Sequence, residues 1–589
     1  MASGSKVHPV PPFQPQYILA ALGVLQRTFD AVQNYWGGVQ VGHRGRYSVQ
    51  RLLSFRDYCQ RTSSTRVLLV CTGSLVPAFL TATLVECIPL QSPDEGWKAN
   101  YMFWIRLYLS SLPIAFGAVY QVKEVIEPNV ISTTGIVVTG VGSCTCYVAL
   151  TMAIASQWRF PIPFGYVLTV APFVFLYMAF FMLSIGPRVL AKSAILRHQI
   201  FSQMLVIAAQ GVLAIAYPTF SAVFNQLSGN QQAAFIFVLP VIKFCIKQVI
   251  AKASAHLHEC VALIVVFSVD VCNVLYVVVC MQTATSPLTT TLMITLDSFF
   301  VVLALRSIYY QSAVSQARRK RPASPPAARV DYLQDLMDLI RDAFRGRSMV
   351  SVPIRVLSPV PLPLSVESTR FMSELVHAKQ RHGNHADFSM HLTKCSPTSA
   401  RLESVRTTTW TSNRQLILRE LEPALSSVIP TTVSKTVVST AYQNRIAPAE
   451  DQASAIEDAQ DSLQVLFHSE YVVMAEFIEF AIPLLYAVYL TVLYHLPTAV
   501  YYPHTHSLTP DQFANAQINL LMYSSVELTL FAGLNLLLKR TFGFSPLYQL
   551  AFVLETQVAT LQGHLFLWIS VILPMTLVHN GVDLKTPFK

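Results

Sequence analysis

Eleven runs of about 20 apolar residues constrain the fold of this chain more than any other feature. A helix of about 20 residues crosses the roughly 30 Å hydrocarbon core of a bilayer. Of the 589 residues, 53% are hydrophobic and 13% are charged, and this charged fraction is about half that of soluble domains. The sequence therefore predicts an all-α polytopic membrane helix bundle. The runs are Val67–Pro89, Phe103–Tyr120, Val130–Ala155, Phe164–Ile185, Phe201–Val223, Ala233–Ala251, Cys260–Met281, Thr289–Tyr310, Tyr471–Tyr494, Phe513–Leu538 and Leu550–Thr576.

Basic residues alternate between the loops as the positive-inside rule describes. They crowd the approach to the first run and follow the fourth, sixth, eighth and tenth runs, whereas the loops after the fifth and seventh runs contain none. This pattern predicts a cytosolic N-terminus, and eleven crossings then leave the C-terminus on the external or lumenal side. The pattern does not distinguish the plasma membrane from an endomembrane. The net charge of +10 fits loops beside anionic lipid, so no nucleic-acid partner is expected.

A long insert separates the eighth run from the ninth. Its Pro-rich stretch Pro353–Pro363 and a later Ser/Thr-rich stretch are typical of flexible chain. Apolar residues at helical spacing from Leu333 to Phe344 predict a helix, and Asp451–Glu470 is expected to run straight into the ninth span. The predicted segments are a cytosolic N-terminal segment with an amphipathic helix (1–66), an eight-helix membrane bundle (67–310), a basic, largely disordered cytosolic insert (311–470), a three-helix membrane segment (471–578) and a short external tail (579–589).

Charged side chains lie near the middle of several apolar runs, where insertion scales give each a cost of about 2.5 to 3.5 kcal/mol. Such residues normally face a bundle interior or a wet cavity. Asp270 and Asn273 are three positions apart and are expected to share a helix face, and polar residues follow four-residue spacing along the tenth run. The predicted intramembrane polar lining consists of Lys243, Asp270, Asn273, Asp297, Glu476, Glu479, Asn519, Tyr523, Glu527, Glu555 and Gln562.

Two interpretations of this lining stay open. In the first, the acids line a pathway for a cation, a proton or a small polar solute, because intramembrane acids are the usual relay groups of pumps and transporters. In the second, ion pairs such as Lys243 with Asp270 hold the helices together. A third explanation is a misplaced span boundary, in which case a charge predicted near the bilayer centre lies elsewhere. No CxxC, zinc-ligand, HExxH, GxSxG, Walker A or kinase pattern occurs, so the sequence predicts no catalytic residue, metal site or cofactor.

Four stretches carry phrases specific enough to indicate a family. They are Gly42–Cys71 (GHRGRYSVQRLLSFRDYCQRTSSTRVLLVC), Glu86–Arg106 (ECIPLQSPDEGWKANYMFWIR), Tyr494–Thr505 (YHLPTAVYYPHT) and Phe542–Gln557 (FGFSPLYQLAFVLETQ). They resemble a large oomycete family of uncharacterised multi-pass transmembrane proteins. The similarity covers both ends of the chain and most of the predicted helices, and the insert is least alike. The resemblance implies an integral membrane protein and supplies no activity.

The residues favour a transporter or channel for a cation or small polar solute, with the intramembrane acids as its site. The alternative is a non-transporting membrane receptor or scaffold that acts through the insert. The expected partners are therefore the lipid bilayer, a cation or small polar solute, and, for the alternative, a cytosolic protein bound by residues 311–470.

Overall fold

A computed structural model describes residues 41–126, 130–227, 237–283, 301–309, 332–345, 354–382, 449–506 and 508–581, with the single positions 231, 234, 235, 295, 298 and 299. The predicted amphipathic helix before residue 41, ten of the 22 residues of the eighth apolar run (Asp297 among them) and eight of the eleven residues of the predicted external tail lie outside these residues. Every regular element in the described ranges is a helix.

Helix α22 begins and ends at clear sequence signals. Helix α22 (Pro510–Phe542) starts with a capping box, in which the side chains of Thr509 and Gln512 each accept a hydrogen bond from the other residue's backbone. It stops at Gly543, whose φ of 78° is a conformation that glycine adopts without steric cost. The local sequence therefore sets the length of this helix before any packing occurs.

Nine described helical segments are long and apolar enough to cross a membrane, and they confirm the polytopic helix bundle. They correspond to nine of the eleven predicted runs. The segments are Ser64–Glu86, made of α3 (Ser64–Gly73) and α4 (Val76–Glu86); α6 (Tyr101–Val125); α7 (Thr133–Gln157); α8 (Gly165–Ile185); Ala194–Phe220 within α10 (Ala194–Gln226); Ala255–Val279, which contains η3 (Ala255–Cys260), α13 (Val261–Val265), η4 (Val266–Asp270) and most of α14 (Val271–Thr283); Ala455–His495 within α20 (Ala449–His495); α22; and Val558–Thr576, made of α24 (Val558–Ile572) and η7 (Leu573–Thr576).

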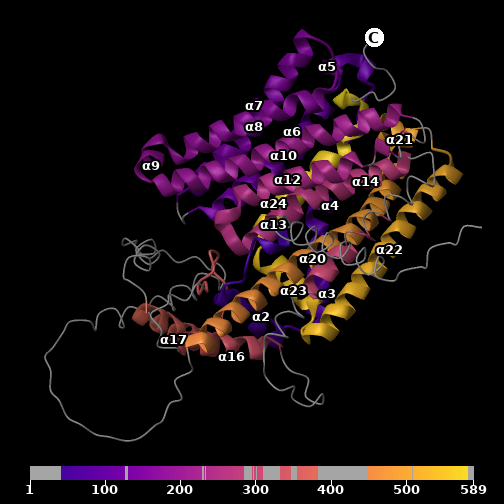
Figure 1. Cartoon of the computed structure of the whole chain (residues 1–589). Helices are drawn as coiled ribbons and strands as arrows, with labels where there is room; N and C mark the ends of the chain where they lie inside the picture. Colours follow the sequence, from indigo (N-terminus) through magenta and orange to yellow (C-terminus); the bar gives the residue numbers. More distant parts are fainter. Residues whose placement is uncertain are drawn as a thin grey trace, which may run out of the picture.

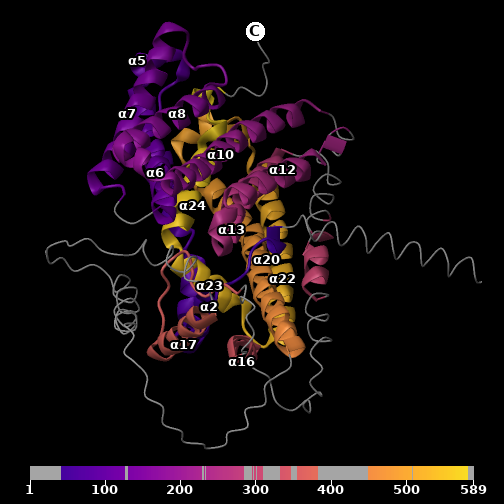
Figure 2. The same cartoon turned by 60° about the vertical axis from the view of Figure 1, so that its left-hand side comes forward.

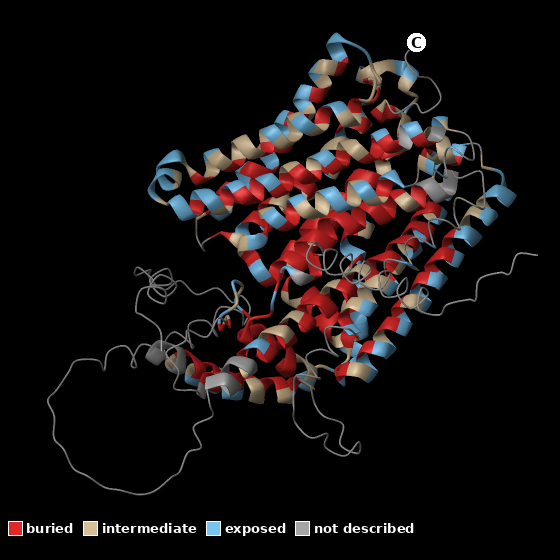
Figure 3. Cartoon of the chain, in the orientation of Figure 1, coloured by how far each residue is buried: buried red, intermediate tan, exposed pale blue. Residues whose placement is uncertain are grey.

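One of these segments forms the centre of the bundle. The apolar window of Ala255–Val279 is completely buried, whereas only 22% of the window of α8 is buried. A helix that is apolar all round is typical of such a central position. Around it, α24 packs along α6, α22 along α20 and α8 along α7 (Figures 1 and 2). Figure 3 shows the resulting buried core running through α13 and the lower half of α20, with exposed faces on the outer helices.

Two predicted spans need correction. In place of the run Ala233–Ala251, helix α12 (Val238–Ala253) has 16 residues. At 1.5 Å per residue this helix is about 24 Å long, which is short of the bilayer core. The run Leu550–Thr576 is not one helix, because Gln557, with φ −121° and ψ 35°, ends α23 (Pro546–Thr556) before α24 begins.

The described parts of the insert are folded against the rest of the chain. The predicted helix forms as α16 (Tyr332–Arg345), and its apolar face is buried against α20, which begins at Ala449 and so confirms the predicted helical entry into the ninth span. Figure 1 shows α16 and a second insert helix, α17 (Val366–His382), beside α2 (Val49–Arg61) at the end of the molecule opposite α5 (Gly96–Ala99).

The stretch that precedes α17 was expected to be flexible, but its described part is held by α2. The backbone N–H groups of Val49 and Gln50 donate to the carbonyls of Arg355 and Val356 at 2.9 and 3.0 Å. The Asp57 carboxylate accepts from the backbone N–H of Ser365 at 2.6 Å. These hydrogen bonds satisfy backbone groups of the extended chain. The described part of the stretch is therefore held in place against α2 although it contains prolines.

Two histidines, the buried His579 and the half-buried His504, give the end of the molecule that contains α5 a pH dependence. His579, in η8 (Val578–Asn580), has Nε2 2.8 Å from the carbonyl oxygen of Gln91, and Nδ1 of His504 lies 3.1 Å from the hydroxyl of Thr576. Burial lowers the pKa of each imidazole to about 4. An unfolded histidine has a pKa of about 6.5, so the unfolded state binds more protons between pH 6.5 and 4.

We therefore expect stability to be full above pH 6.5 and to fall as the pH is lowered toward 4, by up to about 3 kcal/mol for each histidine. Melting temperatures of the purified protein between pH 7.5 and 4.5 measure this loss. The His579→Gln variant should show a shallower slope, and replacing the exposed His495 by Gln should leave the slope unchanged. Equal slopes in all three proteins would contradict the assignment.

Candidate functional site

Four helical elements meet at the best candidate site. They are α12, the π-helical turn η4 at the middle of the central span, α20 and α22. In η4 the backbone N–H of Val271 bonds the carbonyl of Val266, five residues earlier. Such a π-helical turn inside a helix is frequent at functional sites because it widens the helix locally. Here it places Asp270 against α12.

Asp270 is the anchor of the site. Its carboxylate is completely buried and lies 2.8 Å from Nζ of Lys247 and 3.1 Å from Nζ of Lys243. Lys243 also lies 3.5 Å from the carboxylate of Glu479, and Lys247 donates to the hydroxyl of Tyr471 at 2.9 Å. The predicted pair of Lys243 with Asp270 is thus confirmed, and it extends into a chain of ion pairs from α12 to α20.

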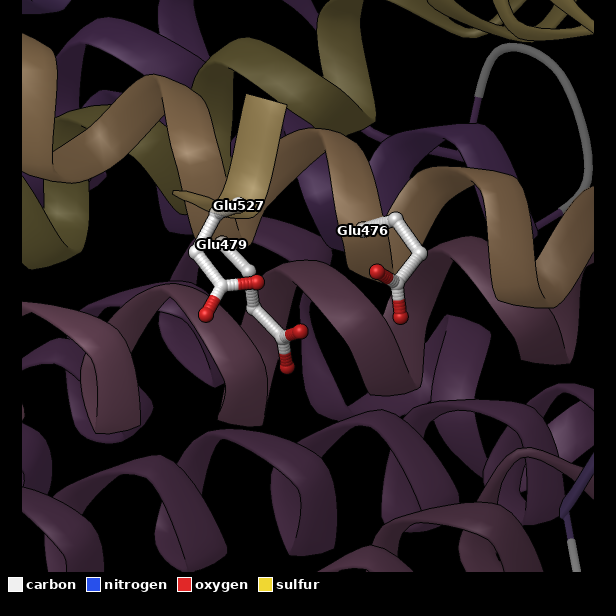
Figure 4. Close-up of side chains that lie close together, drawn as sticks. All are labelled: Glu476, Glu479 and Glu527. Carbon is white, nitrogen blue, oxygen red and sulfur yellow. The ribbon is translucent and has the colours of Figure 1, made fainter. Parts of the chain in front are cut away.

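Three glutamates continue the site across to α22. Glu476 and Glu479 lie one turn apart on α20, and Glu527 comes from α22. All three are buried, and one carboxylate oxygen from each can be chosen so that the three atoms lie within 4.8 Å of one another. Figure 4 shows the three carboxyl groups on the same side of the α20 ribbon, with those of Glu479 and Glu527 adjacent.

We call this group the charged cluster and define it as Lys243, Lys247, Asp270, Glu476, Glu479 and Glu527. It contains four carboxyl groups and two ammonium groups, so full ionisation would give it two net negative charges. Carboxylates that lie close together in a low-dielectric interior repel one another, and a proton or a cation between them relieves the repulsion. Carboxylate oxygens are also the ligands that hard cations such as Ca²⁺ and Mg²⁺ prefer.

The structure separates the other predicted lining residues from this cluster. Asn273 lies near Asp270 in sequence but contacts a different helix, because its side chain accepts from the hydroxyl of Tyr217 on α10 at 3.0 Å. The two side chains therefore bond to different helices, Asp270 to α12 and Asn273 to α10, although they stand three positions apart. Asp297 lies outside the described residues.

The predicted stripe along the tenth run is only half correct. Tyr523 is buried one turn before Glu527, but Asn519 is exposed on the surface of α22.

The two lining residues predicted in the eleventh run also lie away from the charged cluster. Glu555 precedes the break at Gln557 and pairs with Arg66 and with the hydroxyl of Tyr58. Gln562 donates to the backbone carbonyl of Ser74 at 2.6 Å, so it joins α24 to the first span.

Sequence reasoning missed Lys247 and Tyr471 as members of the site. Lys247 could have been found, because it lies four residues after Lys243 and so on the same helix face. Tyr471 carried no signal, since it stands at the start of a predicted span and aromatic residues are common there.

A second buried ion pair, which the sequence did not reveal, joins the N-terminal segment to α20. Arg51 lies 2.7 Å from Glu470, which also accepts a hydrogen bond from Tyr47, and Gln549 on α23 donates to Tyr47 at 2.9 Å. Burial by itself lowers the pKa of the Arg51 guanidinium, but Glu470 and Tyr47 raise it above its usual value. These contacts join α2, α20 and α23, which makes the pair a structural joint between the three helices.

Comparison with known proteins gives no relative from which to transfer a role: no family model, curated protein or solved structure matches the chain. The charged cluster therefore has to be interpreted from its own geometry.

Proposed function

We propose that this integral membrane protein is a transporter or channel for a cation or a small polar solute, and that the charged cluster is its substrate or coupling site. The observation that supports the proposal is the gathering of four carboxyl groups around two lysines, on helices of a membrane bundle. A purely structural site could be built more cheaply from apolar side chains of the same volume, because buried ion pairs seldom increase stability.

The charged cluster has two parts with different contacts, and this difference supports the proposed function. Asp270 is bound to both lysines, which fixes α12 to the central span. The glutamates lie between α20 and α22, which contact each other along most of their shared length. A bound cation or proton changes the repulsion among Glu476, Glu479 and Glu527, so it changes how closely α20 and α22 approach at this level.

The alternative of a receptor or scaffold acting through the insert has less support. The face of α16 that a partner helix or groove would most readily bind is the apolar one, and Leu336 and Ile340 on that face are fully buried in the protein itself. The described part of the insert is therefore engaged with α2 and α20 and does not present this face to a partner.

The test is a flux assay with Glu527→Gln. The parent protein is reconstituted into liposomes that enclose a pH-sensitive dye, and a gradient of one cation or small polar solute at a time is imposed from a panel. For at least one solute of the panel, the dye should report proton movement across the membrane. We expect Glu527→Gln to lower this flux at least tenfold, because the amide keeps the shape but cannot ionise. Its melting temperature should stay within a few degrees of the parent, because glutamine keeps the size and shape of the buried glutamate side chain.

The control is Glu95→Gln, which removes an exposed acid outside the spans and should leave flux unchanged. Full flux in the Glu527→Gln protein would exclude the glutamates as the pathway. Parent liposomes no more permeable than empty ones, across the panel, would exclude the transport function.

A further inference from the structure

A partly open cavity lies away from the charged cluster, among α6, α7, α8, α10 and α24. It is lined by side chains from five membrane-crossing segments and shares no lining residue with the cluster. Its lining follows one face of α6 from Phe103 to Gln121, a rise of about 27 Å at 1.5 Å per residue. The cavity is therefore nearly as long as the bilayer core is thick.

The cavity is narrow as well as long. It offers about 100 Å³ of space to the centre of a water molecule, which over this length corresponds to a slot about one hydrocarbon chain wide. Its walls are mainly aliphatic and aromatic, with Phe173, Val174 and Ile207 among them. An apolar slot of this kind excludes ordered water unless polar groups hold it, and it favours an apolar chain.

The polar side chains of the lining divide into two sets. Tyr147 and Gln210 have protein partners, since Tyr147 shares a hydrogen bond with Thr169 at 3.1 Å and Gln210 donates to Ser268 at 3.0 Å. By contrast, Nε2 of Gln121 and the hydroxyl of Tyr177 are buried and have no hydrogen-bond partner among the described residues. A buried polar group without a partner costs about 1–3 kcal/mol, so these two groups point to a ligand that bonds them.

These two groups lie at the same end of the cavity. Tyr177 packs in one buried cluster with Val119 and Val122, which stand on either side of Gln121 along α6. Both groups are neutral. The one charged side chain of the lining, Arg106, bonds Glu86 and donates to the hydroxyl of Tyr502 at 2.7 Å, so its charge is already balanced. The cavity therefore offers hydrogen bonds at one end without a net positive charge.

We propose that the cavity binds a neutral single-chain lipid, with its chain along α6 and its hydroxyl or ester oxygens bonded to Tyr177 and Gln121. The surrounding bilayer supplies such molecules, and the length of the slot matches a chain that reaches across most of the core. A neutral head suits two uncharged groups, whereas an anionic head would be buried beside them without a counter-charge. This inference does not depend on the transport function.

Gly211 provides a way to fill the slot. A Cβ at this position would lie 3.4 Å from Val174 and 3.8 Å from Val170, which are ordinary contact distances to two lining residues. A leucine side chain at 211 would therefore occupy the slot without displacing the backbone. Gly533 on α22 is the matched control, because a Cβ there meets nothing within 4 Å and the residue does not line the cavity.

The experiment measures binding of tritium-labelled 1-monooleoylglycerol to the purified full-length protein. We expect saturable binding to the parent and to Gly533→Leu, and at least tenfold weaker binding to Gly211→Leu. Tyr177→Phe should bind about three- to tenfold more weakly, the effect of one hydrogen bond, without loss of melting temperature. Ionised oleate and oleoyl lysophosphatidate should compete at least tenfold less well than the unlabelled neutral lipid.

Three results would overturn the proposal: no saturable binding to the parent, equal binding to Gly211→Leu and Gly533→Leu, or anionic lipids that compete as well as the neutral one. If Gly211→Leu does not fold, Tyr177→Phe decides the outcome, because the phenylalanine keeps the ring and removes a hydroxyl that bonds no described residue. Unchanged affinity in Tyr177→Phe would then exclude the assigned head-group position.

Discussion

Replacing the buried Asp270 by asparagine is expected to remove about 3 kcal/mol of folding free energy, because it leaves two half-buried ammonium groups without their shared carboxylate. Lys247 loses its contact with the Asp270 carboxylate at 2.8 Å, and Lys243 keeps its contact with Glu479 at 3.5 Å. Thermal unfolding of the detergent-solubilised protein measures the effect. The double variant Asp270→Asn with Lys247→Met should regain part of the loss, since it removes one of the stranded charges.

The matched substitution Asp94→Asn changes an exposed acid and should leave the melting temperature unaltered. A melting curve of Asp270→Asn that overlays the parent would show that the ion pairs do not hold α12 to the central span. Together with Glu527→Gln, the variant separates two roles inside one cluster. Asp270 is expected to govern stability, and Glu527 is expected to govern flux.

Introducing a side chain at Gly117 should also destabilise the protein, because the backbones of α6 and α24 touch there. A Cβ at Gly117 would lie 2.9 Å from both Cα and O of Gly563, and a Cβ at Gly563 would lie 2.7 Å from the carbonyl oxygen of Gly117. Backbone atoms cannot rotate away as a side chain can, so α6 and α24 would have to separate. We expect about 1–3 kcal/mol of destabilisation for Gly117→Ala and more for Gly117→Val.

The Gly533→Ala and Gly533→Val variants provide the comparison, since nothing lies within 4 Å of the added carbon. The alanine variant should be as stable as the parent or up to about 1 kcal/mol more stable, because alanine favours helix over glycine. If the Gly117 and Gly533 series behave alike, the close approach of α6 and α24 is not a determinant of stability. Close approach through small residues is the usual packing device of membrane helices, so a large difference is expected.

The membrane bundle could be predicted from the sequence because its signal is local. Each span is a run of apolar residues about as long as the bilayer is thick, and α16 showed its buried face through residues three and four apart. The break at Gln557 could not be predicted, because neither glycine nor proline marks it. It moved Glu555 out of the predicted eleventh span.

The candidate site could be predicted only in part, because the sequence of a helix shows that one face is polar but does not show which other helix packs against that face. The depth of Lys243 and Asp270 was sufficient to suggest their pairing, since two opposite charges in an apolar interior stabilise each other. Asn519 and Glu527 share the same spacing pattern, yet one is exposed and the other is buried, because α20 covers only part of α22. The docking of the insert depends on contacts such as Gln50 with Ser358, which are 308 positions apart.

The length of α20 gives the molecule a lever. From Ala449 to Glu479 this helix contains no glycine or proline, so its first part is a straight rod without a hinge. The carbonyl of Ser462 accepts from the hydroxyl of Tyr332 on α16, and Ser462 lies about 25 Å along the rod from Glu479. A tilt of about 5° at the charged cluster therefore displaces this contact by about 2 Å. If the proposed change of protonation at the charged cluster tilts α20, the helix carries that tilt to the insert as a displacement.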